Sequence, residues 1–198
     1  MSAVIAEVPE LQDAVFDAQR SFRITLDALA HPGRVYRIPS QSDGVPELAP
    51  AGVSICLCLL DQTTSLWLDP QLQATPAASF FHFHTGCKVT DNPGEAGFAI
   101  IRRAEAFGSI PEFPLGTPEY PDRSATLIIE VDGLREGGGI KLSGPGIETE
   151  SQLTVKGLPD IFWPLVRRNN LMFPTGVDFF LVADNDVVGL PRTTKVDG

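Results

Sequence analysis

Apolar residues recur every three or four positions between about residues 14 and 30. The residues with this spacing are Val15, Ala18, Phe22, Leu26 and Leu29. Such spacing places them on one face of a helix, which normally packs against the core. Residues 31–33 read His-Pro-Gly, and proline cannot continue a helix while glycine tolerates the turn that ends it. The pattern predicts a helix over about 14–30 whose apolar face is buried.

A second set of residues on the same helix lies opposite this stripe. Phe16, Arg20, Arg23 and Asp27 step by four, three and four positions. An exposed aromatic ring beside two arginines is a composition that the centres of protein interfaces favour. The alternative is a solvated face on which Arg23 and Asp27 pair at a spacing of four. We expect this face to contact a partner.

The remaining apolar segments alternate between strand and helix patterns. Strands are predicted at about 34–38, 65–69, 98–102, 125–131, 140–143, 177–183 and 187–190. Helices are predicted at about 71–83, with Pro76 a weak point, and from Pro159 to about 169, where Pro164 would disturb the first turns. The run at 53–60 fits a buried helix or a buried strand. We expect 140–143 to form a hairpin with 125–131 across Gly137-Gly138-Gly139.

Interleaved helices and strands predict an α/β fold, a single domain with a mixed sheet flanked by helices. The chain of 198 residues is long enough for one such domain. We expect an ordered core over about 12–196.

Composition excludes several classes of partner. The net charge of −10 argues against nucleic acid, which requires a basic surface. The longest apolar run, at 53–60, is far shorter than the roughly 20 residues that span a membrane, and no signal peptide is evident. The three cysteines, Cys56, Cys58 and Cys87, show no disulfide framework. These features indicate free thiols and a cytoplasmic protein.

Two groups of residues are candidate metal ligands. His82, His84 and Cys87 carry imidazole and thiolate groups that suit zinc, although residues two apart on a helix do not share a face; the alternative is a helix end that these side chains cap. Asp178, Asp184 and Asp186 are possible magnesium ligands or ordinary strand-start and turn residues. The spacings favour the ordinary structural roles, so we predict no metal ligands and no catalytic residues.

Five segments occur together in an order that is typical of one family. They are Asp17–Arg23 with Ala28–Gly33, Phe83–Thr85, Leu142–Ile147, Phe173–Asp178 and Pro191–Thr194. With these segments, the chain from about residue 12 to residue 196 resembles the H subunit of the bacterial carbon–phosphorus lyase system for phosphonates (PhnH).

The resemblance implies a fold related to a reduced large domain of pyridoxal-phosphate transferases without the cofactor site. None of the four lysines, at positions 88, 141, 156 and 195, has recognisable cofactor-motif flanks. The resemblance also implies partnership with the G, I, J and L proteins, and a homodimer when the subunit is isolated. In that system the subunit supports formation of ribose-1-phosphonate 5-triphosphate from ATP and an alkylphosphonate, and we expect an accessory, non-catalytic role.

A second function remains open. The chain could be a stand-alone, metal-assisted enzyme for a small molecule, with its pocket between the loop at 106–123 and Phe83-His84-Thr85. The candidate pocket residues are His84, Thr85, Thr117 and Arg192.

Overall fold

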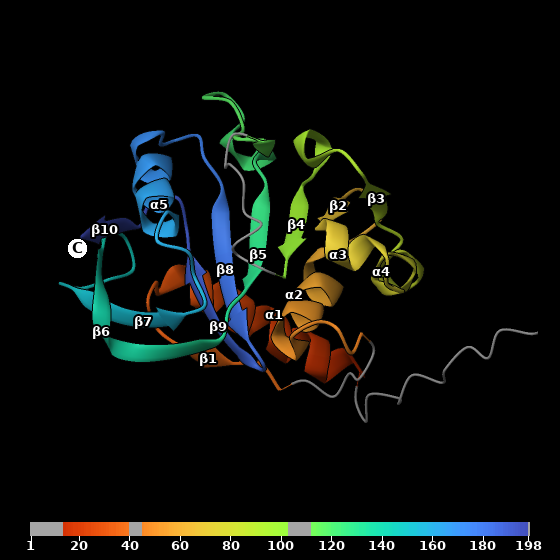
Figure 1. Cartoon of the computed structure of the whole chain (residues 1–198), viewed down its shortest axis with the longest axis horizontal. Helices are drawn as coiled ribbons and strands as arrows, with labels where there is room; N and C mark the ends of the chain where they lie inside the picture. The colour runs from red at the N-terminus through yellow and green to blue at the C-terminus, as the bar shows by residue number, and fades with distance from the viewer. Residues whose placement is uncertain (1–13, 40–44, 103–111, 198) are drawn as a thin grey trace, which may run out of the picture.

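The protein is built around one large mixed sheet with helices on one face and a helix and a small second sheet on the other (Figure 1). The computed structural model describes residues 14–39, 45–102 and 112–197. The arrangement confirms the predicted α/β class with a mixed sheet flanked by helices. Among the helices in the described part of the chain, none combines the length and the apolar character that a membrane-spanning segment requires.

The large sheet has seven strands in the order β1-β9-β8-β5-β4-β2-β3. Five strands run parallel: β2 (Ser65–Leu68), β3 (Lys88–Thr90), β4 (Phe98–Ile101), β5 (Thr126–Glu130) and β8 (Asp178–Ala183). Antiparallel pairings extend the sheet at one side through β9 (Asp186–Leu190) and β1 (Tyr36–Arg37). Six of the seven predicted strand segments lie in this sheet, β3 was not predicted, and the seventh segment, at 140–143, is a strand of another sheet.

The segment at 140–143 belongs to a separate three-stranded sheet, so its predicted hairpin with 125–131 is wrong. That sheet has the order β10-β6-β7 and consists of β6 (Gly133–Ser143), β7 (Ser151–Lys156) and β10 (Lys195–Asp197). The glycines at 137–139 form an irregularity inside β6, where the register with β7 shifts. Their φ angles of 80°, 66° and 67° are left-handed, a conformation that glycine adopts without strain. The glycine run therefore bends one long strand and does not close a turn.

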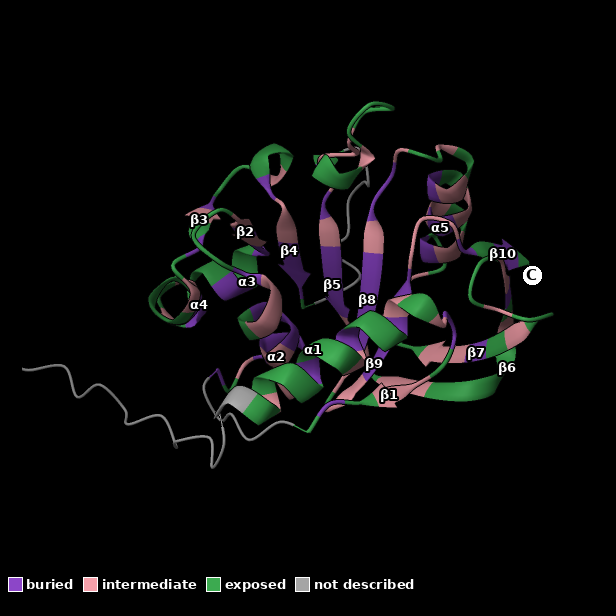
Figure 2. Ribbon diagram, turned by 180° about the vertical axis from the view of Figure 1, so that it is seen from behind, coloured by how far each residue is buried: buried purple, intermediate pink, exposed green. Residues whose placement is uncertain are grey.

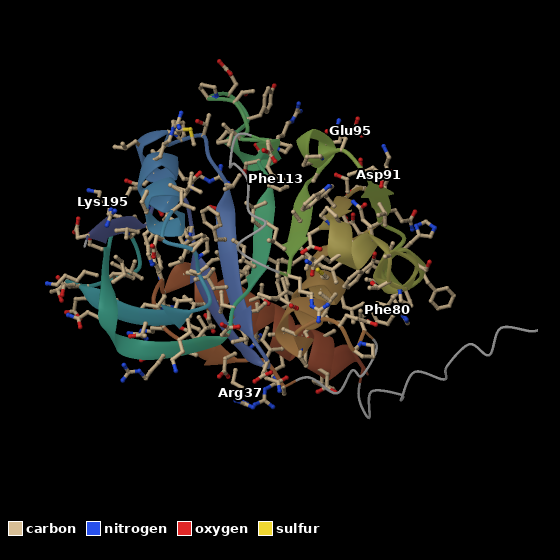
Figure 3. The ribbon with its side chains drawn as sticks, in the orientation of Figure 1. Arg37, Phe80, Asp91, Glu95, Phe113 and Lys195 are labelled. Carbon is tan, nitrogen blue, oxygen red and sulfur yellow. The ribbon has the colours of Figure 1, made fainter. Side chains whose placement is uncertain are left out.

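The large sheet buries side chains on both faces, as a parallel sheet covered on two sides requires. The first core lies under α1 (Ala14–Ala30), α2 (Pro50–Leu59), α3 (Pro70–Gln73) and α4 (Ala77–Thr85). The second lies under α5 (Phe162–Leu171) and the small sheet. Successive residues of β5 enter opposite cores, because Ile128 joins the first and Ile129 the second. Phe113 joins the second core and meets the Trp67 ring edge-on at 5.6 Å (Figure 3).

Helix α1 has the predicted bounds but a different buried face. Ser21, Thr25 and Ala28 are buried, whereas Phe22 and Leu26 are 40% and 49% exposed. Small residues allow close packing on β9: a Cβ at Gly189 would lie 2.6 Å from the Ala28 carbonyl carbon. The outward side of α1 is largely exposed (Figure 2). The apolar stripe that we expected in the core is therefore partly open to solvent.

The other helices show what the run at 53–60 forms and how Pro76 and Pro164 affect the predicted helices. The run at 53–60 lies mostly in helix α2, which begins at Pro50, where proline lacks only a hydrogen bond that the first turn does not make. Pro76 separates α3 from α4 and thus breaks the helix predicted over 71–83. Pro164 is the third residue of α5, still within the first turn, so its missing N–H costs no intrahelical hydrogen bond.

Two short 3-10 helices complete the described elements. They are η1 (Pro93–Glu95) before β4 and η4 (Pro121–Arg123) before β5.

Candidate functional site

Polar residues stand at the carboxyl ends of four parallel strands. Asp69 follows β2, Arg102 follows β4, Glu130 ends β5, and Asp184 follows β8. The strand order reverses at β2, because the next strand in sequence, β3, pairs on one side of β2, and the following strand, β4, pairs on its other side. In open α/β sheets, ligands bind outside the carboxyl ends of the strands at such a switch point.

A cleft of about 620 Å³ opens beside this switch point, at the carboxyl ends of β4, β5 and β8, within the size range of small-molecule sites. Its polar lining residues are Glu47, Arg102, Glu130 and Asp184. The apolar wall comes from Val131 and from the segment before and into α2, namely Val45, Pro46, Leu48, Ala49 and Pro50. A smaller hollow of about 260 Å³ shares Arg102, Glu130 and Val131 and adds Asp132.

Asp69 ties together the ends of β2 and β4. Its Oδ1 accepts the Gln71 and Leu72 N–H groups at 2.9 and 3.0 Å, which caps α3. Its Oδ2 accepts the Arg102 N–H at 2.7 Å. Asp69 is only 2% exposed, so its role is to hold the backbone that presents Arg102 to the cleft.

Glu130 is the cleft's most perturbed acid. Its Oε1 accepts the Ala49 N–H at 2.5 Å, just before α2 begins. Burial raises the pKa of this carboxyl from 4.5 to about 7, although the Ala49 N–H and the Arg102 charge both favour the ionised form. Glu130 therefore changes its charge near neutral pH.

The cleft also holds unsatisfied hydrogen-bonding groups. Glu47 Oε2 is buried without a hydrogen-bond partner, and buried carboxylate oxygens normally have one. The four ion pairs formed within residues 14–39, 45–102 and 112–197 do not include Arg102. The Arg102 guanidinium and Glu47 Oε2 thus line one cleft and can each form further hydrogen bonds. We did not predict this site from the sequence, although polar residues directly after predicted strands were a usable signal.

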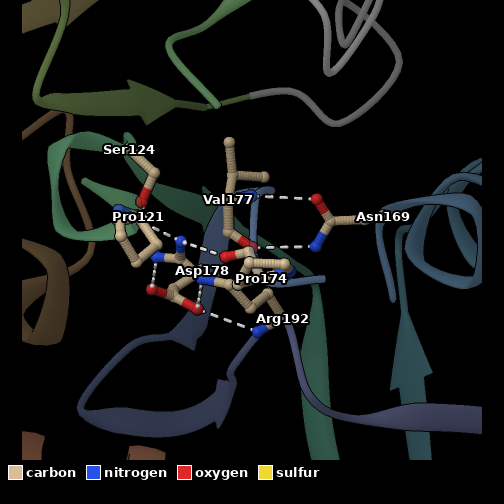
Figure 4. Close-up of polar contacts among 7 residues, drawn as sticks. All are labelled: Pro121, Ser124, Asn169, Pro174, Val177, Asp178 and Arg192. Carbon is tan, nitrogen blue, oxygen red and sulfur yellow. Dashed lines mark hydrogen bonds and ion pairs between the residues drawn. The ribbon is translucent and has the colours of Figure 1, made fainter. Parts of the chain in front are cut away.

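Arg192, a predicted pocket residue, is fully occupied by structural contacts (Figure 4). Its guanidinium donates to Asp178 through Nε and Nη2, at 3.2 and 2.6 Å. It also donates to the Pro121 carbonyl at 2.7 Å, to the Pro174 carbonyl at 3.4 Å and to Ser124 Oγ at 2.5 Å. These contacts use all five guanidinium N–H groups. Arg192 therefore fastens the starts of β5 and β8 to neighbouring loops.

Thr117 lies in a turn that leads to the same region. Its hydroxyl accepts the Tyr120 N–H at 3.1 Å, and η4 follows, where Arg192 contacts the Pro121 carbonyl. A shallow hollow of about 350 Å³ beside Arg192 is lined by Phe173, Pro174 and Thr193 among others, and Thr117 does not line it.

His84 and Thr85 lie apart from Thr117 and Arg192, at the end of α4. The His84 ring packs against Phe80 and Phe83, with centroids 4.4 and 5.1 Å away. Thr85 donates to the Phe81 carbonyl at 2.7 Å and accepts the Cys87 N–H at 3.1 Å. For the part of the chain that the structure describes, no hydrogen bond, ion pair or ring contact joins these two residues to Thr117 or Arg192.

The residues considered as metal ligands also have other partners. His82 Nδ1 lies 2.9 Å from the Cys87 carbonyl oxygen. Asp178 starts β8 and binds Arg192, whereas Asp186 binds Arg37 at 3.0 Å on the surface (Figure 3). Within the described ranges, no group of three His, Cys, Asp or Glu side chains is arranged to hold a metal ion.

The face of α1 that we predicted as an interface is exposed. Phe16 is 67% exposed, and Arg20, Arg23 and Asp27 are exposed beside it. On α1, neither the predicted aromatic–arginine face nor much of the apolar stripe is covered by the rest of the described chain.

Comparison with known proteins gives a consistent result. The family model described as "Bacterial phosphonate metabolism protein (PhnH)" matches residues 9–197. A relative from Rhizobium meliloti (strain 1021), named alpha-D-ribose 1-methylphosphonate 5-triphosphate synthase subunit PhnH, is 40% identical over 93% of this chain and 92% of its own length. A putative C-P lyase subunit protein HtxG from Stutzerimonas stutzeri is 30% identical over 90% of this chain and 85% of its own.

Proposed function

Because the chain belongs to the PhnH family of bacterial phosphonate metabolism proteins, we propose that it is a subunit of a carbon–phosphorus lyase system. In this role it supports formation of ribose-1-phosphonate 5-triphosphate from ATP and an alkylphosphonate. The observation that carries the proposal is the match over nearly the whole chain, to relatives whose names describe subunits. A match of this extent includes the α1 surface and the cleft together.

We propose further that the subunit is accessory and does not catalyse the reaction alone. A nucleophile needs an aligned base or a lowered pKa. The ring contacts of His31 and His82 are with the backbone carbonyls of Asp27 and Cys87, and His31 also meets Tyr36. Burial raises the pKa of the Cys56 and Cys58 thiols, which disfavours their reactive thiolates.

The partners in this proposal are the G, I, J and L proteins, with a homodimer when the subunit is alone. The α1 surface supports a protein contact, because Phe16 is exposed on one face with Arg20, Arg23 and Asp27. Phe22 and Leu26, on the neighbouring apolar stripe, are partly exposed as well. Large exposed apolar side chains with polar neighbours are typical of interaction sites. The three free thiols accord with a location in the cytoplasm.

A reconstitution assay tests the function. The G, I and L proteins of the same bacterium are mixed with ATP and methylphosphonate, with and without this chain, and adenine release is measured. The proposal predicts that release depends on adding the chain. Equal release without the chain would contradict the proposed role.

A further inference from the structure

The cleft lies at the carboxyl ends of β4, β5 and β8, and none of its described lining residues belongs to the α1 face that is proposed for a protein contact. Two of its carboxyl groups come from different segments: Glu130 from the end of β5 and Glu47 from the chain before α2. The hydrogen bond from Ala49 to Glu130 Oε1 fixes these segments against each other. The cleft is thus held in place by contacts of its own.

Glu47 is the cleft residue that most clearly lacks a hydrogen-bond partner. Its Oε2 is buried and lacks a hydrogen-bond partner, although leaving a buried acceptor unsatisfied is costly. Glu47 lines the same cleft as Glu130 and Asp184. A ligand with hydrogen-bond donors near these carboxyl groups would supply the partner that Glu47 Oε2 lacks.

The charge and the walls of the cleft narrow the chemistry of the ligand. Of the described residues, three carboxyl groups and one guanidinium line it, and this balance suits a neutral hydrogen-bond donor better than a phosphate. The described carboxyl groups do not converge on a metal position. Apolar side chains of Val45, Leu48 and Val131 also line the cleft, which suits the carbon face of a ring. Arg102 can donate to a ring or hydroxyl oxygen.

We propose that this cleft binds a ribosyl group, whose vicinal hydroxyls donate to Glu47 and Glu130 while its ring lies toward the apolar wall. Carboxylates in α/β proteins bind ribose hydroxyls at equivalent strand-end positions. The same sugar could arrive as a free pentose or as part of a nucleoside. The inference rests on the proposed function and deepens it, because ATP and the ribose-1-phosphonate product both contain a ribosyl group. The titration uses the isolated chain, so its failure is distinguishable from failure of the reconstitution assay.

The test is calorimetric titration of the full chain at about pH 8 with D-ribose, adenosine and 2′-deoxyadenosine. Binding of D-ribose would identify the free sugar as sufficient, and binding of adenosine alone would identify a nucleoside. In either case 2′-deoxyadenosine should bind at least about tenfold more weakly than adenosine, because it lacks a hydroxyl that donates to a charged acceptor. Binding by neither D-ribose nor adenosine, or equal binding of the deoxy compound, would overturn the proposal.

Variants separate a ligand role of Glu47 from a structural one. Glu47→Gln should weaken binding about tenfold or more while leaving the free energy of unfolding unchanged or higher, because the replaced oxygen has no partner in the fold. Glu148→Gln, an exposed position in the loop between β6 and β7, is the matched control and should change neither. Unchanged binding by Glu47→Gln would also overturn the proposal. Co-purification of the same variant with partner subunits tests the proposed function separately.

Discussion

Arg192 and Asp178 form a bidentate ion pair in which Nε lies 3.2 Å from Oδ1 and Nη2 lies 2.6 Å from Oδ2. The Arg192 backbone N–H also donates to Asp178 Oδ1, at 2.8 Å. Both side chains are largely buried, with 13% and 22% of their surface exposed. The pair joins the start of β8 to the segment after β9, so it stabilises the strand whose other end leads into Asp184.

Replacing Arg192 should therefore destabilise the fold. Arg192→Ala leaves Asp178 without its partner in a largely buried position, which costs about 3 kcal/mol. Arg192→Lys should lose most of that energy too, since an ammonium cannot reproduce the five-donor fork. The free energy of unfolding from urea titration is the measurement. Arg37→Ala breaks an exposed pair with Asp186 and should cost less than about 1 kcal/mol; equal losses in the two variants would refute the structural role.

Glu130 should make stability depend on pH near neutrality. Its pKa is raised from 4.5 to about 7 by burial, so the folded chain binds more protons than the unfolded chain between these values. The free energy of unfolding should consequently fall as pH rises through this window. Glu130→Gln keeps an oxygen for the Ala49 N–H but cannot ionise. Relative to the wild type it should gain up to roughly 3 kcal/mol between pH 4.5 and pH 8.

Urea titrations at several pH values check this expectation. The glutamine variant should show a flatter profile than the wild type. Parallel profiles would mean that Glu130 has an ordinary pKa in the folded chain.

Sequence patterns found the large sheet because its strands are continuous apolar runs. The run from Val177 to Ala183 is a clear example, because β8 is buried on both faces. A strand of this kind can be predicted from its own sequence, without knowing which strands pair with it. The small sheet was harder to predict. Apolar and polar residues alternate only weakly in β7. Its pairing with β6 depends on the glycine irregularity at 137–139, and the same glycines are equally typical of a turn.

Helix α1 shows a second limit. Its apolar residues predicted the helix but not the buried face, because Gly189 on β9 permits an approach that only small side chains can fill. Ser21 and Thr25 are tolerated there, since the Thr25 hydroxyl donates to the Ser21 carbonyl at 2.8 Å. The cleft was missed for a related reason: Glu47 and Glu130 are 83 positions apart in the sequence, and only the packing of the segment before α2 against the end of β5 brings them to one cleft.

The exposed face of α1 should matter for assembly and not for folding. The double variant Phe16→Ala, Arg20→Ala should change the free energy of unfolding by less than about 0.5 kcal/mol. It should weaken self-association or capture by partner subunits, because a buried aromatic ring contributes roughly 1.5–3 kcal/mol. Sedimentation analysis and pull-down measure these effects.

Tyr120 and Arg123 provide a matched control for that variant. They form another exposed aromatic–arginine pair, with the guanidinium 4.2 Å from the ring centroid. Their double alanine variant should assemble normally. If both double variants behave like the wild type, the face of α1 is a solvated surface and makes no contact.

The isolated chain should not convert ATP and methylphosphonate, and it should purify without zinc or pyridoxal phosphate. The expectation for zinc rests on the contacts of His31, His82 and His84, which involve backbone carbonyls, Tyr36 and phenylalanine rings. The expectation for pyridoxal phosphate rests on the four lysines, none of which has recognisable cofactor-motif flanks. Chromatographic detection of adenine, elemental analysis and an absorption spectrum test these points. Adenine release by the chain alone would favour the stand-alone enzyme.

The most direct test of membership in a carbon–phosphorus lyase assembly is co-expression with the G, I and J proteins of the same bacterium, followed by size-exclusion chromatography and native mass spectrometry. We predict one species whose mass includes this chain in a fixed ratio to the other subunits. Elution of the chain by itself, beside a complete assembly of the others, would contradict the account.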